Sequence, residues 1–398
     1  MKQEIKNYKV YRMSLTTLSP IFIGSGEELN KSMYVYKGKE ISVIDERKLT
    51  KKLLSIRGLY ENFLSECFSG NLNLTDFLKK NLYGYEKMDI YKYNAISYSD
   101  VKTKGKLNNI NTFIKSSNGN PYIPGSSIKG AIRTAIIANE IYLNKEKYID
   151  FFKYENPINN LEDNKNPIKN LENKVLSNIF SNFSYKFKKD EVKPNILFKF
   201  LHVSDTNEVA LDNLFIGKQY DFSTKGNKLN ELPIFMEFIR PKTKFNFILS
   251  LDKSVVDYFD IKNIMRNIRN YFGQYFYCIS KINDLLFKLL ENKEIKHNLF
   301  NILEDLKFNA FIGGHNGYLT KNILYSICCQ FENNTVSGII NQEKIIYILK
   351  KHLDIKFSKH RHSKEDNIMS PRTLKLTKYE ETLFNIGICN IKVEEELC

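Results

Sequence analysis

The stretch PYIPGSSIKGAIRTAIIANEIY, residues 121–142, decides the fold class, because it changes within a few residues from extended chain to helix. A Pro-Gly turn ends the extended part. Apolar residues then recur at spacings of three and four, which is the period of an amphipathic helix. A strand, a tight turn and a helix in succession predict a mixed α+β fold.

Strand-like segments precede this unit. Residues 8–23 predict a strand that is broken near Pro20 and ends at a turn, Gly24-Ser25-Gly26. Residues 32–44 predict a β-hairpin, and residues 48–68 carry the apolar spacing of one amphipathic helix.

Three polar segments interrupt this pattern. Residues 89–120 have no clear period, and we expect them to form short strands and loops that project from the body. The segment 154–176 contains the imperfect tandem duplication NPINNLEDNKNPIKNLENK, whose polarity predicts a flexible surface insertion. Residues 217–230 are predicted to be a polar linker.

The second half repeats the plan of the first. Residues 234–251 contain two strand-like runs, residues 255–290 have a long helical period, and residues 308–330 predict a strand, a glycine-rich turn and a helix. A length of 398 residues favours two cores over one. We therefore expect two domains, residues 1–216 and 230–398.

The charge balance points to a polyanionic partner. Sixty Lys and Arg residues against forty-five Asp and Glu give a net charge of +15, which is typical of nucleic-acid-binding proteins. The alternative is that abundant lysine only keeps a large protein in solution. Six cysteines without a C-x-x-C pair, and no apolar run of membrane-spanning length, predict a cytoplasmic chain that does not contact a membrane.

The turn before the 121–142 helix is the first candidate site. Ser126 or Ser127 can cap the helix, and backbone N–H groups of its first turn are then available to an anion such as a phosphate. Basic side chains and glycines coincide with them. The candidates are Gly125, Ser126, Ser127, Lys129, Gly130 and Arg133. The alternative is that the glycines serve only a tight turn and close packing, while Lys129 and Arg133 point into water.

A second glycine-rich turn, FIGGHNG at 311–317, precedes Lys321. Its glycines, Gly313 and Gly314, permit close backbone approach. His315 is interpreted as a hydrogen-bonding group, because no partner acid or base is evident. The basic stretch 356–378, which includes Arg372 and Lys375, fits a phosphate-tracking surface and a solvated loop equally well.

Four motifs in matching order suggest a family. They are SPIFIGSGEE (19–28), YIPGSSIKGAIRTAI (122–136), FIGGHNGYLTK (311–321) and SPRTLKLT (370–377). Together they resemble RAMP proteins of type III-A CRISPR systems, above all the Csm-complex subunit that caps the 3′ end of the crRNA.

The resemblance implies two ferredoxin-like (RRM-like) domains whose glycine-rich loops lie against an RNA backbone. It further implies a non-catalytic role in crRNA maturation and assembly, within a ribonucleoprotein complex of antiviral defence. The implied partners are the crRNA 3′ portion, the backbone RAMP subunit and the small helical subunit. Recruitment of a host ribonuclease stays open, and no metal or cofactor is expected.

The motifs and the basic residues near them define the expected RNA contacts. These are Gly24, Ser25, Gly26, Gly125, Ser126, Ser127, Lys129, Gly130, Arg133, Gly313, Gly314, His315, Lys321, Arg372 and Lys375. No aromatic RNP1-like run is present, so base stacking on a sheet face is not expected. The rival interpretations are an endoribonuclease that uses His315 or an aspartate such as Asp100, and a scaffold that contacts only proteins.

Overall fold

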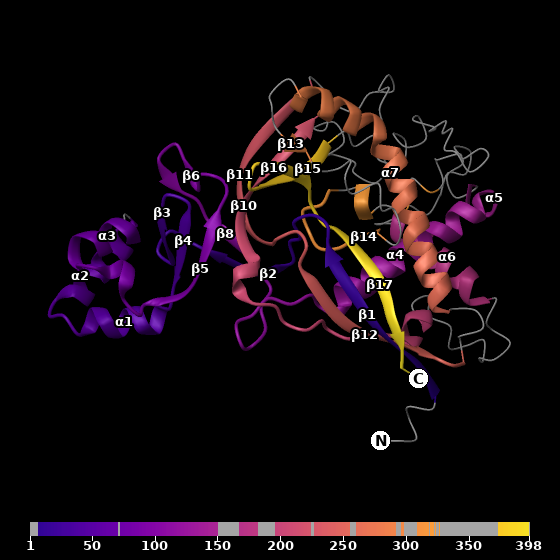
Figure 1. Ribbon diagram of the computed structural model, residues 1–398, viewed down its shortest axis with the longest axis horizontal. Helices are drawn as coiled ribbons and strands as arrows, with labels where there is room; N and C mark the ends of the chain where they lie inside the picture. The colour runs from indigo at the N-terminus through magenta and orange to yellow at the C-terminus, as the bar shows by residue number, and fades with distance from the viewer. Residues whose placement is uncertain are drawn as a thin grey trace.

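Two curved sheets with helices packed on one side form the body of the protein (Figure 1). The computed structural model describes residues 7–70, 72–149, 167–181, 196–223, 227–254, 260–291, 296–297, 309–317, 319–321, 323, 326 and 373–397. Within these residues the mixed α+β class predicted from the sequence is confirmed.

The first sheet has five antiparallel strands in the order β14-β17-β1-β12-β9. Their bounds are β1 (Tyr8–Thr17), β9 (Leu201–Val203), β12 (Lys244–Asp252), β14 (Asn309–Phe311) and β17 (Ile388–Glu396). Strict alternation explains β12, because Phe245, Phe247, Leu249 and Leu251 all face the core and are buried.

Helices α4 (Gly125–Leu143), α6 (Pro167–Ser181) and α7 (Ile261–Glu291) lie beside this sheet (Figure 1). Buried Asn139 joins α4 to α7, since its amide donates to Asn267 at 2.8 Å and accepts from Asn270 at 3.0 Å. In chain order, β1-α4-β9-β12-α7-β14 is the βαββαβ succession of a ferredoxin-like unit. The C-terminal strand β17 is inserted between its first and last strands.

The second sheet has ten strands, and its main path is β13-β16-β15-β10-β11-β8-β2. Strand β5 joins the side of β10 and continues through β4 to β3. The bounds are β2 (Gly24–Leu29), β3 (Tyr34–Lys37), β4 (Glu40–Ile44), β5 (Tyr91–Ser97), β8 (Ile110–Phe113), β10 (Leu214–Ser223), β11 (Lys228–Ile239), β13 (Lys296–His297), β15 (Thr373–Tyr379) and β16 (Thr382–Asn385). A separate small hairpin pairs β6 (Lys102–Thr103) with β7 (Lys106–Leu107).

A lobe projects from the body at the left of Figure 1. It comprises β3 to β7 together with α1 (Glu46–Leu54), α2 (Leu59–Phe68) and α3 (Leu74–Asn81), and its helices pack on an apolar cluster of their own. The single helix predicted at 48–68 is wrong, because α1 ends at Leu54 and Gly58, with a left-handed φ of 74°, is the N-cap of α2. The segment 89–120, predicted to project, overlaps only partly with this lobe.

Short helices complete the described chain. They are α5 (Lys145–Ile149), η2 (Tyr85–Lys87), η6 (Ile196–Phe200), η7 (Leu211–Asn213) and η8 (Leu319–Lys321). No helix in the described part of the chain is long and apolar enough to cross a membrane.

Two polar segments are more ordered than predicted. Residues 167–176 of the expected insertion begin α6, and Leu171, Val175 and Leu176 are fully buried because their spacing gives the helix one apolar face. Residues 154–166 lie outside the described residues. The linker expected at 217–230 is wrong, since its described residues belong to the β10–β11 hairpin and its polar side chains alternate with buried ones.

The predicted domain boundary lies inside this hairpin. Both sheets contain strands from either side of it: β1 and β12 are neighbours in the first sheet, and β8 and β11 in the second. The hydrophobic core of the body is likewise shared, and one continuous cluster extends from Tyr11 to Ile391.

Candidate functional site

A cavity of about 460 Å³ brings the separate glycine-rich motifs together. The start of β2, the first turns of α4, the N-terminal half of α7, and β14 with the loop after it enclose the cavity. Of the predicted site residues, those that line it are Gly24, Ser126, Ser127, Gly130, Arg133, Gly313, Gly314 and Lys321. Its volume lies in the range of small-molecule sites, which is about 300–1,000 Å³.

The N-terminus of α4 is capped differently from the prediction. Pro124 is the N-cap residue, and the Gly125 N–H donates to Oδ1 of Asp205 at 2.7 Å. A Cβ atom on Gly125 would lie 2.3 Å from the Val203 carbonyl oxygen, so this glycine allows α4 to pack against β9. The expectation of a serine cap is therefore wrong, and a carboxylate already occupies the first helical donor.

Ser126, Ser127 and Gly130 follow this cap and face the cavity. Ser126 and Gly130 are one turn apart on α4 and both are exposed. A Cβ atom on Gly130 would meet no atom within 4 Å, so nothing in the packing of the described residues requires glycine there. The absent side chain leaves room in the cavity.

The cationic groups of the cavity differ in how they are paired. The Arg133 guanidinium donates to the Glu172 carboxylate of α6 at 2.8 Å, and both side chains remain partly exposed. Lys321 of η8 also lines the cavity, and desolvation lowers the pKa of its ammonium group. Lys129 is not among the lining residues, although desolvation lowers its pKa as well. Of the two basic residues predicted on α4, Arg133 therefore lines the cavity and Lys129 does not.

A backbone contact between distant segments positions the second glycine-rich loop. Gly313 adopts a φ of 91°, and a Cβ atom there would lie 2.2 Å from the carbonyl oxygen of Phe22. The Gly314 N–H donates to the same oxygen at 2.7 Å. The glycines therefore allow close approach of one backbone to another, and this contact places the loop beside Gly24.

His315 and Lys375 belong to one hydrogen-bonded chain beside the cavity. The His315 Nδ1 atom lies 2.8 Å from Oε1 of Gln219, and the Gln219 amide donates to Asp221 at 2.9 Å. Asp221 in turn forms an ion pair with Lys375 of β15. Gln219 and Asp221 of β10 were not predicted from the sequence, because the segment 217–230 was interpreted as a linker.

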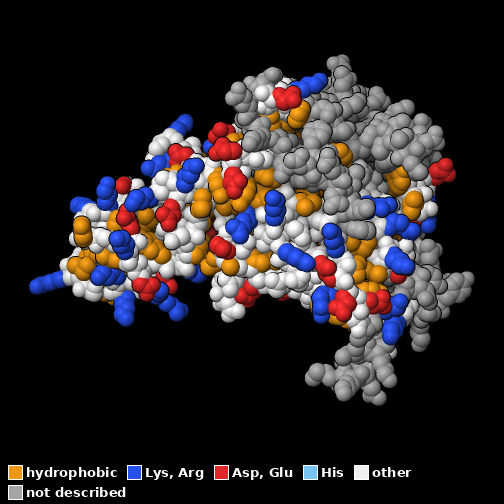
Figure 2. All heavy atoms as spheres, viewed as in Figure 1, with side chains coloured by type: hydrophobic (Ala, Val, Ile, Leu, Met, Phe, Trp, Pro, Cys, Tyr) orange, Lys and Arg blue, Asp and Glu red, His pale blue; other side chains and the backbone are white. Residues whose placement is uncertain are grey.

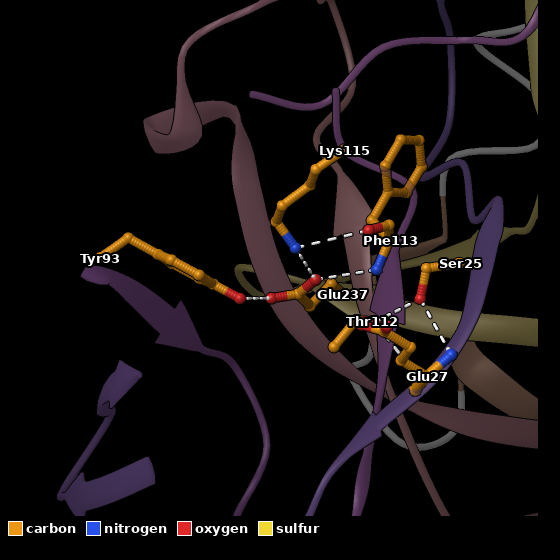
Figure 3. A network of polar contacts seen from close by, with 7 residues as sticks. All are labelled: Ser25, Glu27, Tyr93, Thr112, Phe113, Lys115 and Glu237. Carbon is orange, nitrogen blue, oxygen red and sulfur yellow. Dashed lines mark hydrogen bonds and ion pairs between the residues drawn. The ribbon is translucent and has the colours of Figure 1, made fainter. Parts of the chain in front are cut away.

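Ser25 and Gly26 lie away from this cavity. The turn predicted at 24–26 is wrong: all three residues belong to β2, where the register with β8 shifts. The Ser25 hydroxyl lies 2.5 Å from that of Thr112 and faces a second cavity of about 760 Å³ (Figure 3). Arg372 lies outside the described residues, as does most of the basic stretch 356–378.

A buried carboxylate lies beside the second cavity. Glu237 of β11 is fully buried and accepts from the Lys115 ammonium at 2.5 Å, from the Phe113 N–H at 2.8 Å and from the Tyr93 hydroxyl (Figure 3). Burial and the adjacent carboxylate raise the pKa of the Tyr93 hydroxyl. This network joins the lobe strand β5 to β11 and to the chain after β8. One glutamate in an apolar strand gives no sequence signal for it.

Asp100, the aspartate considered as a catalytic group, has structural partners, and so does Asp205. The Asp205 carboxylate accepts from the Gly125 N–H at the start of α4, although Asp205 follows this helix in the chain. Asp100 accepts from the Lys102 N–H at 3.0 Å and from the Tyr36 hydroxyl at 3.2 Å. Within the described residues no group of three or more His, Cys, Asp or Glu side chains could hold a metal ion.

Comparison with known proteins identifies the family. Residues 14–318 match the RAMP superfamily. The chain belongs to this superfamily. The RAMP match therefore includes the first two glycine-rich motifs and most of the third, which supports the resemblance seen in the sequence.

Individual relatives agree with this assignment. The RAMP chain is 30% identical to the CRISPR system Cms protein Csm5 of Streptococcus thermophilus, over 61% of this chain and 64% of that protein. It is also 30% identical to the Csm5 protein of Methanocaldococcus jannaschii, over 65% of this chain and 60% of the relative. The Csm5 protein of Mycobacterium tuberculosis is 22% identical over 97% of this chain and 98% of its own length.

Solved structures share the fold of the RAMP chain. A chain of a cryo-EM Csm–crRNA–target RNA ternary complex of a type III-A CRISPR-Cas system matches with a TM-score of 0.64, at 18% identity, over 96% of this chain and 100% of that one. The crystal structure of T. onnurineus Csm5 matches with a TM-score of 0.59, at 17% identity, over 95% and 99%.

Proposed function

We propose that this RAMP protein is a crRNA-binding structural subunit of a type III-A CRISPR (Csm) interference complex. In this proposal it caps the 3′ end of the crRNA, aids crRNA maturation and complex assembly, and has no catalytic role of its own. Its neighbours are the backbone RAMP subunit and the small helical subunit. The similarity to Csm5 proteins supports the choice of complex.

The cavity between the glycine-rich motifs is the observation that carries the proposal. Its wall combines hydroxyl groups, an arginine and a lysine with exposed glycines, and such a wall suits a phosphate-containing strand. Lys321 supports the proposal in particular, because an ammonium group that is partly desolvated interacts more strongly with an anion than a fully hydrated one does. Basic side chains are also spread over the visible face of body and lobe (Figure 2).

The geometry of the candidate catalytic groups favours a structural role over the endoribonuclease interpretation. His315 is hydrogen-bonded to Gln219 on β10, whereas Asp100 is held by Tyr36 in the lobe. These two groups thus belong to separate hydrogen-bonded clusters and do not form one catalytic arrangement.

Reconstitution of the complex tests the proposal. The Csm subunits and a crRNA are co-expressed with the wild-type chain, without it, or with Lys321→Gln, and the 3′ ends of the bound RNA are sequenced. Lys37→Gln is the matched control, because Lys37 of β3 in the lobe forms an exposed ion pair with Glu86. We expect uniform, protected 3′ ends with the wild type and the control, and heterogeneous or shortened ends with Lys321→Gln or without the chain.

Two results would contradict the proposal. Identical 3′ ends with and without the chain would exclude capping. Cleavage of labelled single-stranded RNA by the isolated chain, lost on substitution of His315 or Asp100, would establish the endoribonuclease instead.

A further inference from the structure

We propose that His315 accepts a hydrogen bond, at its Nε2 atom, from a 2′-hydroxyl group of the bound strand. The glycine-rich loop would then distinguish RNA from DNA, a role that goes beyond holding phosphates. This inference rests on the proposed RNA-binding function, because it assigns the sugar contact of the same site.

The hydrogen-bonded chain behind His315 fixes which ring nitrogen carries the proton. Lys375 is a donor only and pairs with Asp221, whose ionised carboxylate is an acceptor only. The Gln219 group that meets Asp221 at 2.9 Å must therefore be its NH₂, so its oxygen faces His315. The Nδ1 atom of His315 must then be the N–H donor, and in the neutral ring Nε2 is an acceptor.

The surroundings keep the imidazole neutral. Partial desolvation, then the positive charges of Lys375 and Lys321, lower the pKa of His315, and the opposing effect of Asp221 is smaller. The neutral form therefore predominates at neutral pH, and the ring protonates only when the pH falls below the usual range for histidine.

The backbone and the packing present the ring in one orientation. Gln219 is only 3% exposed, so its amide is fixed by its buried position, whereas His315 itself is solvent-accessible. The edge of the Phe22 ring contacts the imidazole at a centroid distance of 5.4 Å. His315 also adopts a left-handed φ of 55°, which is uncommon for a residue other than glycine, and such conformations concentrate at functional sites.

Among the described residues, the Nε2 atom of His315 has no hydrogen-bond partner, and its acceptor character selects the kind of ligand group. A phosphate oxygen is itself an acceptor and cannot bond to a neutral Nε2 atom. A 2′-hydroxyl can donate, is present on each ribonucleotide, and is the group by which proteins distinguish RNA from DNA. His315 directly follows Gly313 and Gly314, which line the cavity, so a strand held there passes within reach of this residue.

The test compares three oligouridines that differ only at the 2′ position: ribose, 2′-fluoro and 2′-deoxy. The 2′-fluoro sugar keeps the ribose pucker but has no hydroxyl donor. Affinities are measured at neutral pH for the full-length wild type, His315→Asn and Gln219→Met. Asparagine tolerates a left-handed backbone, so His315→Asn removes the imidazole without added strain. His202→Asn is the matched control. His202 is exposed, and among the aromatic rings of the described residues it contacts only Tyr8.

For the wild type and the control we expect the 2′-fluoro strand to bind about 3- to 10-fold more weakly than RNA, which is the effect of one hydrogen bond. His315→Asn should bind both strands equally. Gln219→Met, which removes only the positioning residue, should also lose most of the difference. As the pH is lowered through the depressed pKa of His315, the wild-type preference should shrink, because the protonated ring no longer accepts.

The outcomes separate the two hypotheses. If the wild type binds none of the strands, the proposed RNA-binding function fails. If it binds RNA and the preference for the ribose strand is the same in His315→Asn, the sugar contact is wrong while RNA binding stands. Cleavage of the ribose strand that depends on His315 would likewise overturn the inference, because His315 would then act in catalysis.

Discussion

Gly130 keeps the cavity open simply by having no side chain. It lies within a helix and is exposed, and an added Cβ atom would meet nothing. Gly273 of α7 has the same properties but does not line the cavity. The pair therefore separates an effect on helix stability from an effect on binding.

Gly130→Leu should weaken RNA binding by about tenfold, or about 1.4 kcal/mol, because the new side chain fills the cavity. The fold should not suffer, since leucine raises helix propensity by up to about 1 kcal/mol over glycine. Gly273→Leu should show the same helix gain and unchanged RNA affinity. Fluorescence titration measures the RNA affinity of both variants, and thermal unfolding measures their stability. Equal RNA affinity of the two variants would show that RNA does not bind in this cavity.

Lys321→Gln should make RNA binding weaker and less dependent on salt. One phosphate contact fewer lowers the slope of log affinity against log salt concentration by about 0.7 for a single strand. The slope of Lys37→Gln should match that of the wild type, because Lys37 is paired with Glu86 in the lobe and does not line the cavity. A slope unaltered by Lys321→Gln would place the lysine outside the RNA contact.

Single residues were predicted unevenly. Glycines, serines and basic residues that gather at the cavity could be recognised in the sequence, because their types suit backbone approach and anions. Their internal partners could not. The Glu172 pairing of Arg133 and the Asp205 cap join residues far apart in the chain, and no local pattern encodes such contacts.

At the scale of elements, the Glu237 network holds the lobe strand β5 against the body. Three donors converge on the buried Glu237 carboxylate. They are the Tyr93 hydroxyl of β5, the Phe113 N–H of β8 and the Lys115 ammonium just after β8. A buried ion pair contributes to stability only while both partners remain, because either charge alone is costly to bury.

Lys115→Met should therefore destabilise the protein by about 3–5 kcal/mol, because it leaves Glu237 buried without a cation. The double variant Lys115→Met/Glu237→Leu should regain most of this loss. Lys244→Met is the control, since its pair with Glu394 is exposed and worth at most about 1 kcal/mol. Urea unfolding midpoints measure all three. A single-variant loss as small as that of the control would show that the network does not support the lobe.

Elements with a clear period were predicted well, and elements defined by contacts were not. The hairpin at 32–44 and the helix after Pro124 are confirmed, because alternation and helical spacing are local properties. The β10–β11 hairpin and α6 were missed. Their polar residues dominate the composition, while the buried positions that define them are few.

At the scale of the whole molecule, the first sheet is completed by the C-terminus of the chain. β17 pairs with β1 on one side and β14 on the other, so it is an inner strand. The fold class and the family could be predicted from the sequence. This pairing could not, because more than 370 positions separate Thr17 from Cys389, its partner in the ladder.

Deletion of residues 388–398 should abolish the cooperative thermal transition, because it removes an inner strand and exposes the edges of β1 and β14. Removal of residue 398 alone is the control and should leave the transition in place. Circular dichroism during heating measures both. A melting temperature of the longer deletion within a few degrees of the wild type would show that β17 is dispensable.

The position of β17 also determines when the protein can fold. A ribosome delivers residues 388–396 more than 370 positions after β1, so β1 waits for this inner neighbour until the long intervening chain has emerged. The ferredoxin-like sheet therefore cannot be completed before residues 388–396 are available, and its N-terminal part cannot finish folding as a separate early domain. A chain cut short by a stalled ribosome lacks β17, which lies between β14 and β1 in the sheet. The edges of β1 and β14 are then unpaired, and such edges favour aggregation over assembly.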